Sequence, residues 1–308
     1  MSPTPPQASS EAARTFEALV ADEWAWRLEQ FPRLASLAGD HRYDDRLERV
    51  DAASRQARLQ RWRETRAALA RIDVQALPPT QRVDHAVYAN QIDTLLGELE
   101  HGGALMPMDG DSAFFTYLPD LWREQPMHTP AQLRVHLRRL AAIPLYFADH
   151  IELLREALQR GMVLPAIVMQ GRDRPLQQML AHPGPEATPF FEPFRKLPAA
   201  WPEAERQALC NEARCVIGEQ VLPAYRVLAD FMRDEYLPRT RSSLAAHDLP
   251  GGEAFYAERV RAYTTRPLNA RQVHEQGLQE VARIGADMQR LMRECGFSGE
   301  MDAFLAHL

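Results

Sequence analysis

Apolar residues recur at three- and four-residue intervals along most of the chain, and this spacing restricts the fold more than any other feature. The clearest case lies between residues 270 and 294, where the apolar positions are Val273, Leu278, Val281, Ile284, Met288 and Leu291. Such spacing gives a helix one apolar face, whereas a half-buried strand requires strict alternation. The sequence shows no alternating stretch, no regular succession of strands and helices, and no fixed-period repeat. We therefore predict an all-α protein, a multi-helix array with long connecting loops.

The stretch 249–297 carries the densest helix signals. Asn269 is followed three residues later by Gln272, which is the pattern of a capping box. Gly296 comes after the last apolar position and is expected to end that helix. An N-terminal helix start and a C-terminal stop thus bracket one long amphipathic helix.

Polar side chains mark three earlier helix starts. Asp51 or Ser54 is expected to cap an arginine-rich helix, and Thr80 is well placed to cap the next one. Thr129 before Pro130 combines a cap with a proline in the first turn. A proline further along, at position 144, should kink the helix that Thr129 opens.

Composition and charge exclude several classes of protein. Hydrophobic residues make up 45% and charged residues 25% of the chain, as in ordinary soluble proteins. A net charge of −6 argues against a nucleic-acid partner. The sequence has no apolar run long enough for a membrane span and no signal peptide, so we predict a cytoplasmic protein. A disordered, Pro- and Ser-rich segment over 1–10 and one helical domain over 11–308 are expected.

The sequence predicts no metal site within this chain. The nearest approach to a zinc-peptidase motif is His274 followed by Glu275, but a second histidine is needed four residues after the first. That position is Leu278, on the apolar stripe that we expect to be buried. No two of the ten histidines are three or four residues apart, since the nearest pair is His128 and His136.

Other polar clusters have a structural and a functional interpretation. The cluster His41, Tyr43, Asp44 and Asp45 contains acid–base groups, but it also suits a connector whose aspartates cap the next helix. Asp109-Gly110-Asp111 begins like a calcium loop and lacks the later ligands, so a turn is the better interpretation. The long loop 102–129 around it is of a length that is usually functional or faces a partner.

Several segments together resemble one known family. They are EWAWRLEQFPRLASLAGDHRYDDRL (23–47), ALMPMDGDSAF (104–114), VLPAYRVLADFMRDEYLPRTR (221–241), GGEAFYAERVRAYTT followed by NARQVHEQGLQEVARI (251–284), and GFSGEMDAFLAHL (296–308). In this order they resemble the DUF885 family, bacterial proteins that are similar to zinc metallopeptidases. The resemblance covers essentially the whole chain, and its motifs are structural signatures rather than catalytic ones.

The resemblance implies that this chain is an N-terminal half. Family members carry a zinc-binding HExxH-type helix and a later Glu-Gly-Trp segment in their second half, and neither occurs here. Zinc is therefore expected only in a full-length member, and no cofactor is expected in this chain. The resemblance also places Tyr256, Tyr263, Thr264 and Thr265 on a substrate cleft. The alternative is that the two tyrosines, seven residues apart on one helix face, are packed in the core.

Two functional hypotheses follow. In the first, the chain is the scaffold and substrate-cleft half of a zinc-dependent peptidase or hydrolase, binds a peptide-like substrate, and is not catalytic alone. In the second, it is a non-catalytic, all-helical binding or interaction protein.

The last predicted helix, 300–308, ends on an apolar stripe of Met301, Phe304, Leu305 and Leu308, so the chain looks cut short. We expect the missing C-terminal half or a partner chain to cover that stripe.

Overall fold

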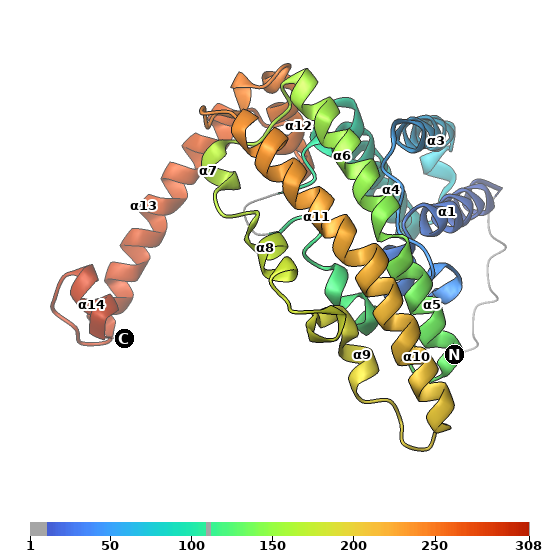
Figure 1. The fold of residues 1–308 in the computed structure, drawn as a ribbon. Coiled ribbons are helices and arrows are strands. Elements are labelled where there is room, and N and C mark those ends of the chain that lie inside the picture. Colours follow the sequence, from blue (N-terminus) through green and yellow to red (C-terminus); the bar gives the residue numbers. More distant parts are fainter. Residues whose placement is uncertain (1–10, 109–111, 308) are drawn as a thin grey trace, which may run out of the picture. The chain divides into compact units, whose positions relative to one another are not determined.

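The computed structural model describes residues 11–108 and 112–307 (Figure 1). Every regular element in these ranges is helical, and the β contacts found there are two isolated bridges, Met108 with Ala113 and Pro165 with Arg241. The predicted all-α class is therefore confirmed. Residues 1–10, which were predicted to be disordered, lie outside the described ranges.

Contacts within the chain divide it into two compact units. The first unit ends at Gly252 and the second begins at Glu253. This division does not test the prediction of a single helical domain over residues 11–308, which stays a prediction. No helix among the described residues is both long and apolar enough to span a membrane.

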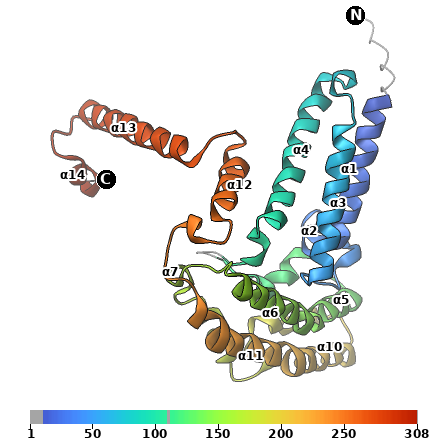
Figure 2. The same ribbon diagram turned by 90° about the horizontal axis from the view of Figure 1, so that it is seen from above.

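Three long helices form one side of the first unit. They are α1 (Glu11–Gln30), α3 (Ala52–Ala70) and α4 (Pro79–Glu100), which lie side by side in both ribbon views (Figures 1 and 2). Their buried core residues are Ala13, Phe16, Trp62, Leu69, Ile72, Leu77, Ile92 and Leu96. A fully buried Leu, Ile or Phe side chain contributes about 1.5–3 kcal/mol to stability. This shared core therefore holds the three helices together.

Two rows of helices form the other side of the first unit. The row of α5 (Pro130–Ala141) and α6 (Ile143–Arg160) runs beside the row of α10 (Glu203–Val216) and α11 (Leu222–Phe231) (Figures 1 and 2). Buried residues on these helices include Leu133, Leu137, Leu140, Phe147, Leu154, Leu209, Ala213, Tyr225 and Leu228. Pro144 lies in the first turn of α6, so the predicted kink is a break between α5 and α6.

Short helices connect these rows. The α-helical ones are α2 (Pro32–Leu37), α7 (Ala166–Met169), α8 (Arg174–Leu180) and α9 (Glu192–Arg195). The 3₁₀ turns are His41–Tyr43, Val74–Ala76, Gly103–Leu105, Leu118–Glu124, Pro185–Ala187, Pro189–Phe191, Leu237–Arg239 and Ala246–Asp248. Two of these turns, Gly103–Leu105 and Leu118–Glu124, divide the predicted loop 102–129 into shorter pieces.

Two turns of π-helix flank α11, at Ile217–Val221 and Met232–Tyr236. A proline follows each of them by two residues, Pro223 and Pro238. A proline has no N–H to donate to the carbonyl four residues earlier, and in both cases that carbonyl lies inside the π turn. The two prolines therefore account for the wider turns, which apolar spacing alone does not reveal.

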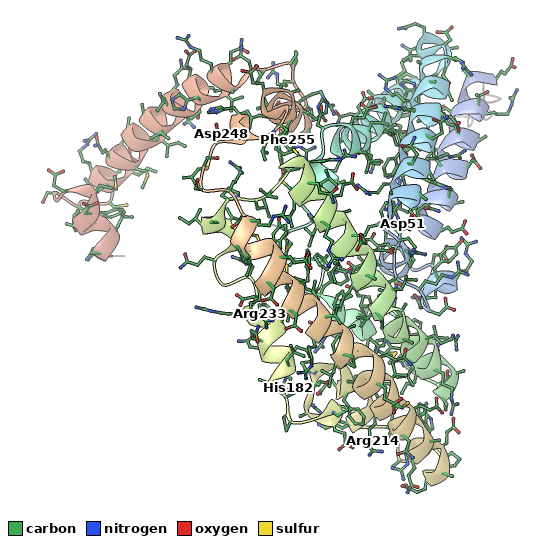
Figure 3. The ribbon with its side chains drawn as sticks, turned by 45° about the horizontal axis from the view of Figure 1, so that its top comes forward. Asp51, His182, Arg214, Arg233, Asp248 and Phe255 are labelled. Carbon is green, nitrogen blue, oxygen red and sulfur yellow. The ribbon has the colours of Figure 1, made fainter. Side chains whose placement is uncertain are left out.

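Side-chain caps fix most helix starts where the sequence predicts them. The Asp51 carboxylate accepts a 2.9 Å hydrogen bond from the Ser54 backbone N–H at the start of α3 (Figure 3). Thr129 and Asn269 each form a complete capping box with the glutamine three residues later. Thr80 is not a cap, because α4 begins one residue earlier, at the second of two consecutive prolines. Proline already has the backbone angle of a first helical turn.

The second unit contains α13 (Ala270–Glu294), α14 (Met301–His307) and all of α12 (Gly252–Thr264) except its first residue. The prediction that the α13 stripe is buried is wrong for most of its members. The exposed fractions are 58% for Leu278, 70% for Val281, 46% for Ile284, 38% for Met288 and 50% for Leu291. Within this unit α14 is too short to cover a helix of 25 residues.

Candidate functional site

A cleft of about 840 Å³ opens between the α1–α3–α4 bundle and α6. Its walls also include α2, the irregular segment 46–50 and part of the loop that follows α4. The polar side chains in the wall include Arg33, Glu48, Arg58, Tyr117, Tyr146 and His150. Part of the wall comes from the loop 102–129, which the sequence predicts to be functional or partner-facing. The wall residues from its second half are Ser112, Ala113, Phe114, Thr116 and Tyr117.

Glu48 faces the cleft from the segment that leads into α3. Among the described residues, no hydrogen-bond donor or ion-pair partner contacts its carboxyl group. Burial raises the pKa of Glu48, and the positive charges of Arg58 and Arg33 offset part of this increase. Enclosing an acid without a partner costs free energy, so such groups concentrate where a ligand binds or reacts.

Two arginines of the cleft wall, Arg33 and Arg58, are held by other groups. The Arg33 guanidinium forms a two-pronged ion pair with Glu124 at 2.8–3.1 Å, and its Cζ lies 4.0 Å from the centre of the Tyr117 ring. Arg58 donates from Nη2 to the Gln30 carbonyl at 3.1 Å. Burial lowers the pKa of Arg58, and the charge of Glu48 acts in the opposite direction. Glu48 thus interacts with both cations through space rather than through hydrogen bonds.

Two tyrosines form a directed hydrogen-bond chain in the cleft wall. The Tyr146 hydroxyl donates to the Phe114 carbonyl at 3.0 Å and lies 2.9 Å from the Tyr117 hydroxyl. Because Tyr146 uses its one proton on the carbonyl, Tyr117 must be the donor between the two hydroxyls. Burial raises the pKa of Tyr117 to about 12, with a further increase from the Glu48 charge. Tyr117 is therefore neutral at physiological pH and keeps its oxygen as an acceptor.

His150 supplies a second acceptor. Its Nδ1 lies 2.8 Å from the Tyr146 carbonyl, which can only accept, so Nδ1 carries the proton. The lone pair then belongs to Nε2, to which no described residue donates a hydrogen bond. Burial lowers the pKa of His150 to about 4, and the ring stacks on Phe114 at 3.9 Å between centroids. The imidazole is therefore neutral and fixed in one tautomer.

A complete cluster of buried polar groups borders the same cleft. Glu23 accepts two hydrogen bonds from Arg27 at 2.9 Å, one from the Trp62 indole at 3.0 Å and one from Tyr88 at 2.7 Å. Glu23 is fully buried and Arg27 is 5% exposed. All four side chains belong to the α1–α3–α4 bundle, so this cluster stabilises the bundle rather than serving a ligand.

Comparison with known proteins places the chain in a family. It matches the family described as "Bacterial protein of unknown function (DUF885)" over residues 32–308. The chain belongs to the DUF885 family. No curated protein matches it.

Two solved structures share the fold of this DUF885 chain. One is titled as a "putative lipoprotein" from Colwellia psychrerythraea, with 16% identity and a TM-score of 0.79 over 94% of this chain and 53% of that one. The other is titled as a "putative lipoprotein of unknown function" from Shewanella oneidensis, with 16% identity and a TM-score of 0.56 over 92% of this chain and 48% of that one. The chain therefore spans about half the length of the structures it matches.

The residues that the DUF885 resemblance assigns to a cleft lie in the second unit. Tyr256 is 46% exposed and Tyr263 is 85% exposed, so the alternative that they are packed core residues is wrong. Thr264 donates to the Val260 carbonyl at 2.7 Å at the end of α12. Thr265 has a positive φ of 56°, a strained conformation for a β-branched residue. Their role in a substrate cleft stays a prediction.

The remaining sequence candidates have local structural roles where they are described. Asp44 is buried between the Ser36 hydroxyl, at 2.5 Å, and His41 Nδ1, at 2.9 Å, so this cluster forms a connector. His274 is exposed on α13. The segment 109–111, which resembles the beginning of a calcium loop, lies outside the described residues.

No group of three or more His, Cys, Asp or Glu side chains suited to a metal ion occurs in residues 11–108 and 112–307. The zinc that the sequence resemblance implies for full-length members stays a prediction.

Glu48, Tyr146 and His150 were not predicted from the sequence. They come from separate segments and meet only through the fold, so no short motif marks them. One signal was available on α6, where Tyr146 and His150 are four residues apart and flank a stripe of apolar residues. Polar aromatic groups on the inner face of a helix are candidates for a cavity wall.

Proposed function

We propose that this DUF885 chain is the substrate-binding scaffold of a hydrolase, and that its cleft holds a peptide-like ligand against Glu48. The observation that carries the proposal is the Glu48 carboxyl, which faces a cleft of about 840 Å³ without a partner among the described residues. Ligand pockets commonly have volumes of about 300–1,000 Å³. The cleft thus has room for a few amino-acid residues.

The acceptors in the cleft favour a ligand that donates hydrogen bonds. Glu48 and the Nε2 atom of His150 can both accept an N–H, and the oxygen of Tyr117 keeps a lone pair. A peptide offers amide N–H groups and an ammonium group, while its carbonyl groups suit the nearby Arg58 cation. Apolar wall residues such as Phe114 and Leu153 provide contacts for its side chains.

Each side chain then has a binding role. Glu48 binds the ligand's ammonium or amide group. An ion pair with the ammonium group would lower the pKa of Glu48 again, because a nearby positive charge favours the ionised carboxylate. His150 orients a second N–H group, because its tautomer is fixed by the Tyr146 carbonyl. None of these groups breaks a bond in this proposal. The groups that cleave the substrate, including the zinc ligands implied by the resemblance, lie outside these 308 residues.

Calorimetric titration with short peptides tests the binding site. A tripeptide with a free amino terminus should bind, and Glu48→Gln should weaken its affinity about tenfold or more, since a hydrogen bond to a charged group contributes about 1.5–3 kcal/mol. The matched control is Glu29→Gln, an exposed glutamate on α1. Equal affinities for the two variants would contradict the proposal.

Peptidase assays test the scaffold assignment separately. The purified 308-residue chain should show no chelator-sensitive cleavage of a mixed peptide library. Cleavage that a chelator abolishes would overturn the assignment of catalysis to residues outside the chain, whatever the titration shows.

The cytoplasmic location predicted from the sequence is likewise open to a test by fractionation of source cells, because the two similar structures are named putative lipoproteins.

One observation favours the second hypothesis, an all-helical interaction protein. The stripe on α13 and Leu305 on α14, at 53% exposed, present apolar side chains to solvent in the described part of the second unit. A partner chain that covers them would remove this apolar surface from water. Sedimentation and hydrophobic-dye binding test this, because a monomer that binds no dye would count against an unpartnered stripe.

A further inference from the structure

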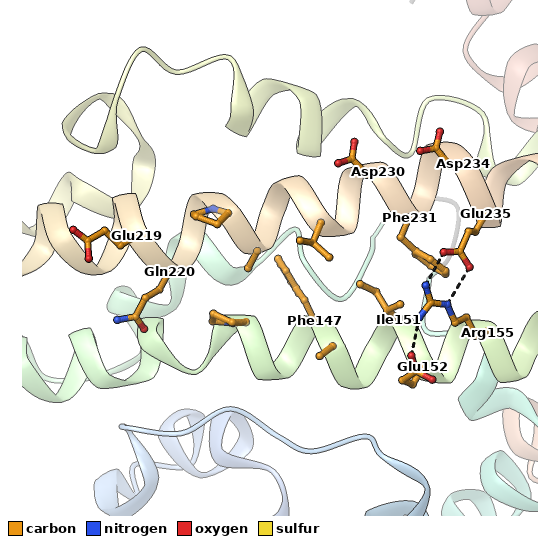
Figure 4. Close-up of a pocket in the computed structure, with 15 residues that line it drawn as sticks. Phe147, Ile151, Glu152, Arg155, Glu219, Gln220, Asp230, Phe231, Asp234 and Glu235 are labelled. Carbon is orange, nitrogen blue, oxygen red and sulfur yellow. Dashed lines mark hydrogen bonds and ion pairs between the residues drawn. The ribbon is translucent and has the colours of Figure 1, made fainter.

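A second hollow of about 720 Å³ lies along the seam between α6 and α11, away from the Glu48 cleft (Figure 4). The two helices run side by side in the same direction there, and all fifteen lining residues belong to them or to the π turns that flank α11. The hollow is therefore a groove that follows a pair of helices, with a long and narrow shape.

The floor of this groove is apolar. Its apolar lining residues are Pro144, Phe147, Ala148, Ile151, Pro223, Ala224, Val227 and Phe231. Phe147 and Phe231 are buried, whereas Val227 is 60% exposed. Water contact with such a floor is unfavourable, and an apolar side chain that covered it would gain about 25 cal/mol for each Å² buried.

The rim of the groove is strongly acidic. Five carboxylates line it, Glu152, Glu219, Asp230, Asp234 and Glu235, against one guanidinium, Arg155. Arg155 pairs with Glu235 at 2.6 Å and with Glu152 at 2.8 Å (Figure 4). From outside the groove, Arg233 pairs with Asp230 at 2.9 Å and with Asp234 at 2.6 Å. These hydrogen bonds lower the pKa of Asp234 and of Glu235, so both are ionised at neutral pH.

The π turns place acidic residues at both ends of the groove. Glu219 belongs to the first π turn, while Asp234 and Glu235 belong to the second. In Figure 4 these two groups stand at opposite ends of the apolar floor. Single π turns inside α-helices occur frequently at functional sites. The exposed ion pairs at the rim contribute about 0–1 kcal/mol each, so a partner's cations can replace them at little cost.

We propose that the α6–α11 groove is a docking site for a cationic amphipathic helix of a partner protein. The apolar face of that helix covers the floor between Phe147 and Phe231. Its lysine or arginine residues, on both sides of the apolar face, pair with the carboxylates at the two ends. Amphipathic helices commonly bind grooves of this type through residues spaced three and four apart.

The test is fluorescence anisotropy of the 308-residue chain with two synthetic helical peptides of about 18 residues, or about five turns. Both carry leucine at positions three and four apart, with lysine at the flanking positions of one peptide and glutamate in the other. The lysine peptide should bind at least about tenfold more tightly. Raising the salt from about 50 mM to about 500 mM shortens the Debye length about threefold and should weaken that binding.

Matched variants locate the binding. Val227→Asn should weaken the lysine peptide about fivefold or more, whereas Val83→Asn, at a 62% exposed valine on α4, should leave it unchanged. The double variant Asp230→Asn with Asp234→Asn should also weaken binding of the lysine peptide. The control is the double variant Glu280→Gln with Glu294→Gln, which should leave that binding unchanged. Because all these positions are exposed, the variants should fold normally.

Three results would overturn the proposal. They are equal binding of the two peptides, equal effects of Val227→Asn and Val83→Asn, and absence of binding at low salt. A concentration-dependent self-association that Val227→Asn abolishes would also overturn it, because the occupant would then be a second copy of this chain. None of these results depends on the Glu48 cleft, so this test and that of the proposed function fail independently.

Discussion

Glu23 and Glu48 are two acids of the first unit with opposite surroundings. Glu23 accepts four hydrogen bonds from Arg27, Trp62 and Tyr88 and is fully buried in the α1–α3–α4 bundle. Glu48 lines the cleft beside that bundle, and in the described part of the chain no donor contacts its carboxyl group. The first acid has every partner that a buried carboxylate needs, and the second has only distant charges.

The difference in hydrogen-bond partners indicates that Glu23 stabilises the fold, whereas Glu48 is available to bind a ligand. A buried ion pair with all hydrogen bonds made holds its neighbours in one arrangement, and loss of one partner is costly. An enclosed acid with no partner costs stability in the free protein and gains a partner when a ligand arrives. Binding sites commonly retain such a cost, because removal of the group would improve stability at the expense of function.

The largest difference between the two acids should appear when each is neutralised in turn. Glu23→Gln should lower the free energy of unfolding by about 3–5 kcal/mol, because Arg27 is then buried without its counter-ion. Glu48→Gln should change it by less than about 1 kcal/mol or raise it. Urea unfolding of both variants at pH 7 measures the two values. Similar losses would mean that Glu48 also has a structural role.

Acid titration of the cleft gives the next largest effect. The pKa of His150 in the folded protein, about 4, lies below its ordinary value of 6.5. The unfolded chain therefore gains a proton first, and stability is lost as the pH falls from 6.5 towards about 4. Each pH unit in this window costs at most about 1.4 kcal/mol, so the total is about 3 kcal/mol.

The His150→Asn variant isolates that contribution. Its free energy of unfolding should fall less steeply between pH 6.5 and 4 than that of the unchanged protein, when both are followed by urea unfolding. His136, which is also buried with a pKa lowered to about 3, acts equally in both proteins and cancels in the difference. Parallel curves would show that the His150 ring is not enclosed as described.

A smaller effect compares one tyrosine beside each acid. Tyr88→Phe removes one of the four hydrogen bonds to Glu23 and should cost about 1–2 kcal/mol. Tyr117→Phe removes a bond between two neutral hydroxyls and should cost about 0.5–1 kcal/mol. Thermal unfolding of the two variants measures the difference. A larger loss for Tyr117→Phe would place the structural network on the cleft side.

The contribution of Glu48 to stability depends on pH in the opposite direction to that of His150. Because burial raises the pKa of Glu48 above 4.5, its contribution is fully present below pH 4.5 and is lost as the pH rises through the folded-state value. The Glu48→Gln variant should therefore gain on the unchanged protein as the pH increases from 4.5. A gain in the opposite direction would mean that a donor stabilises the ionised carboxylate.

The smallest effect is expected in the second unit. Tyr263 is 85% exposed, and Tyr263→Phe should leave the free energy of unfolding within about 0.5 kcal/mol of its original value. A melting curve measures it. A loss comparable to that of Tyr88→Phe would show that this hydroxyl has a structural partner after all.

Much of the fold follows from local sequence signals. Asp51, Thr129 and Asn269 act as caps because a short polar side chain can satisfy backbone N–H groups of its own first turn. Thr80 was wrongly predicted as a cap because the proline before it already fixes the helical angle. Apolar spacing predicts the helices well, but on α13 it does not predict burial, since Leu278 is exposed. Burial depends on what packs against a face.

The candidate site was far less predictable. Tyr117 lies in a loop that its length marked as functional, but Glu48 and His150 are about one hundred residues apart and carry no shared pattern. What distinguishes Glu48 is that its carboxyl group is buried and yet has no partner in the described part of the fold. That property depends on the three-dimensional packing, so it cannot be predicted from a single sequence.

The two π turns change which residues share a face of the helical stretch from Glu203 to Tyr236. A π turn holds one residue more than an α turn, so each behaves as a one-residue insertion that the helix has absorbed. Each extra residue rotates everything beyond it by about 100° about the helix axis. A helical wheel drawn without a break from Glu203 to Tyr236 therefore assigns residues to the wrong faces. Deletion of one residue in the first π turn would remove the extra residue and rotate α11 by about 100° relative to α10.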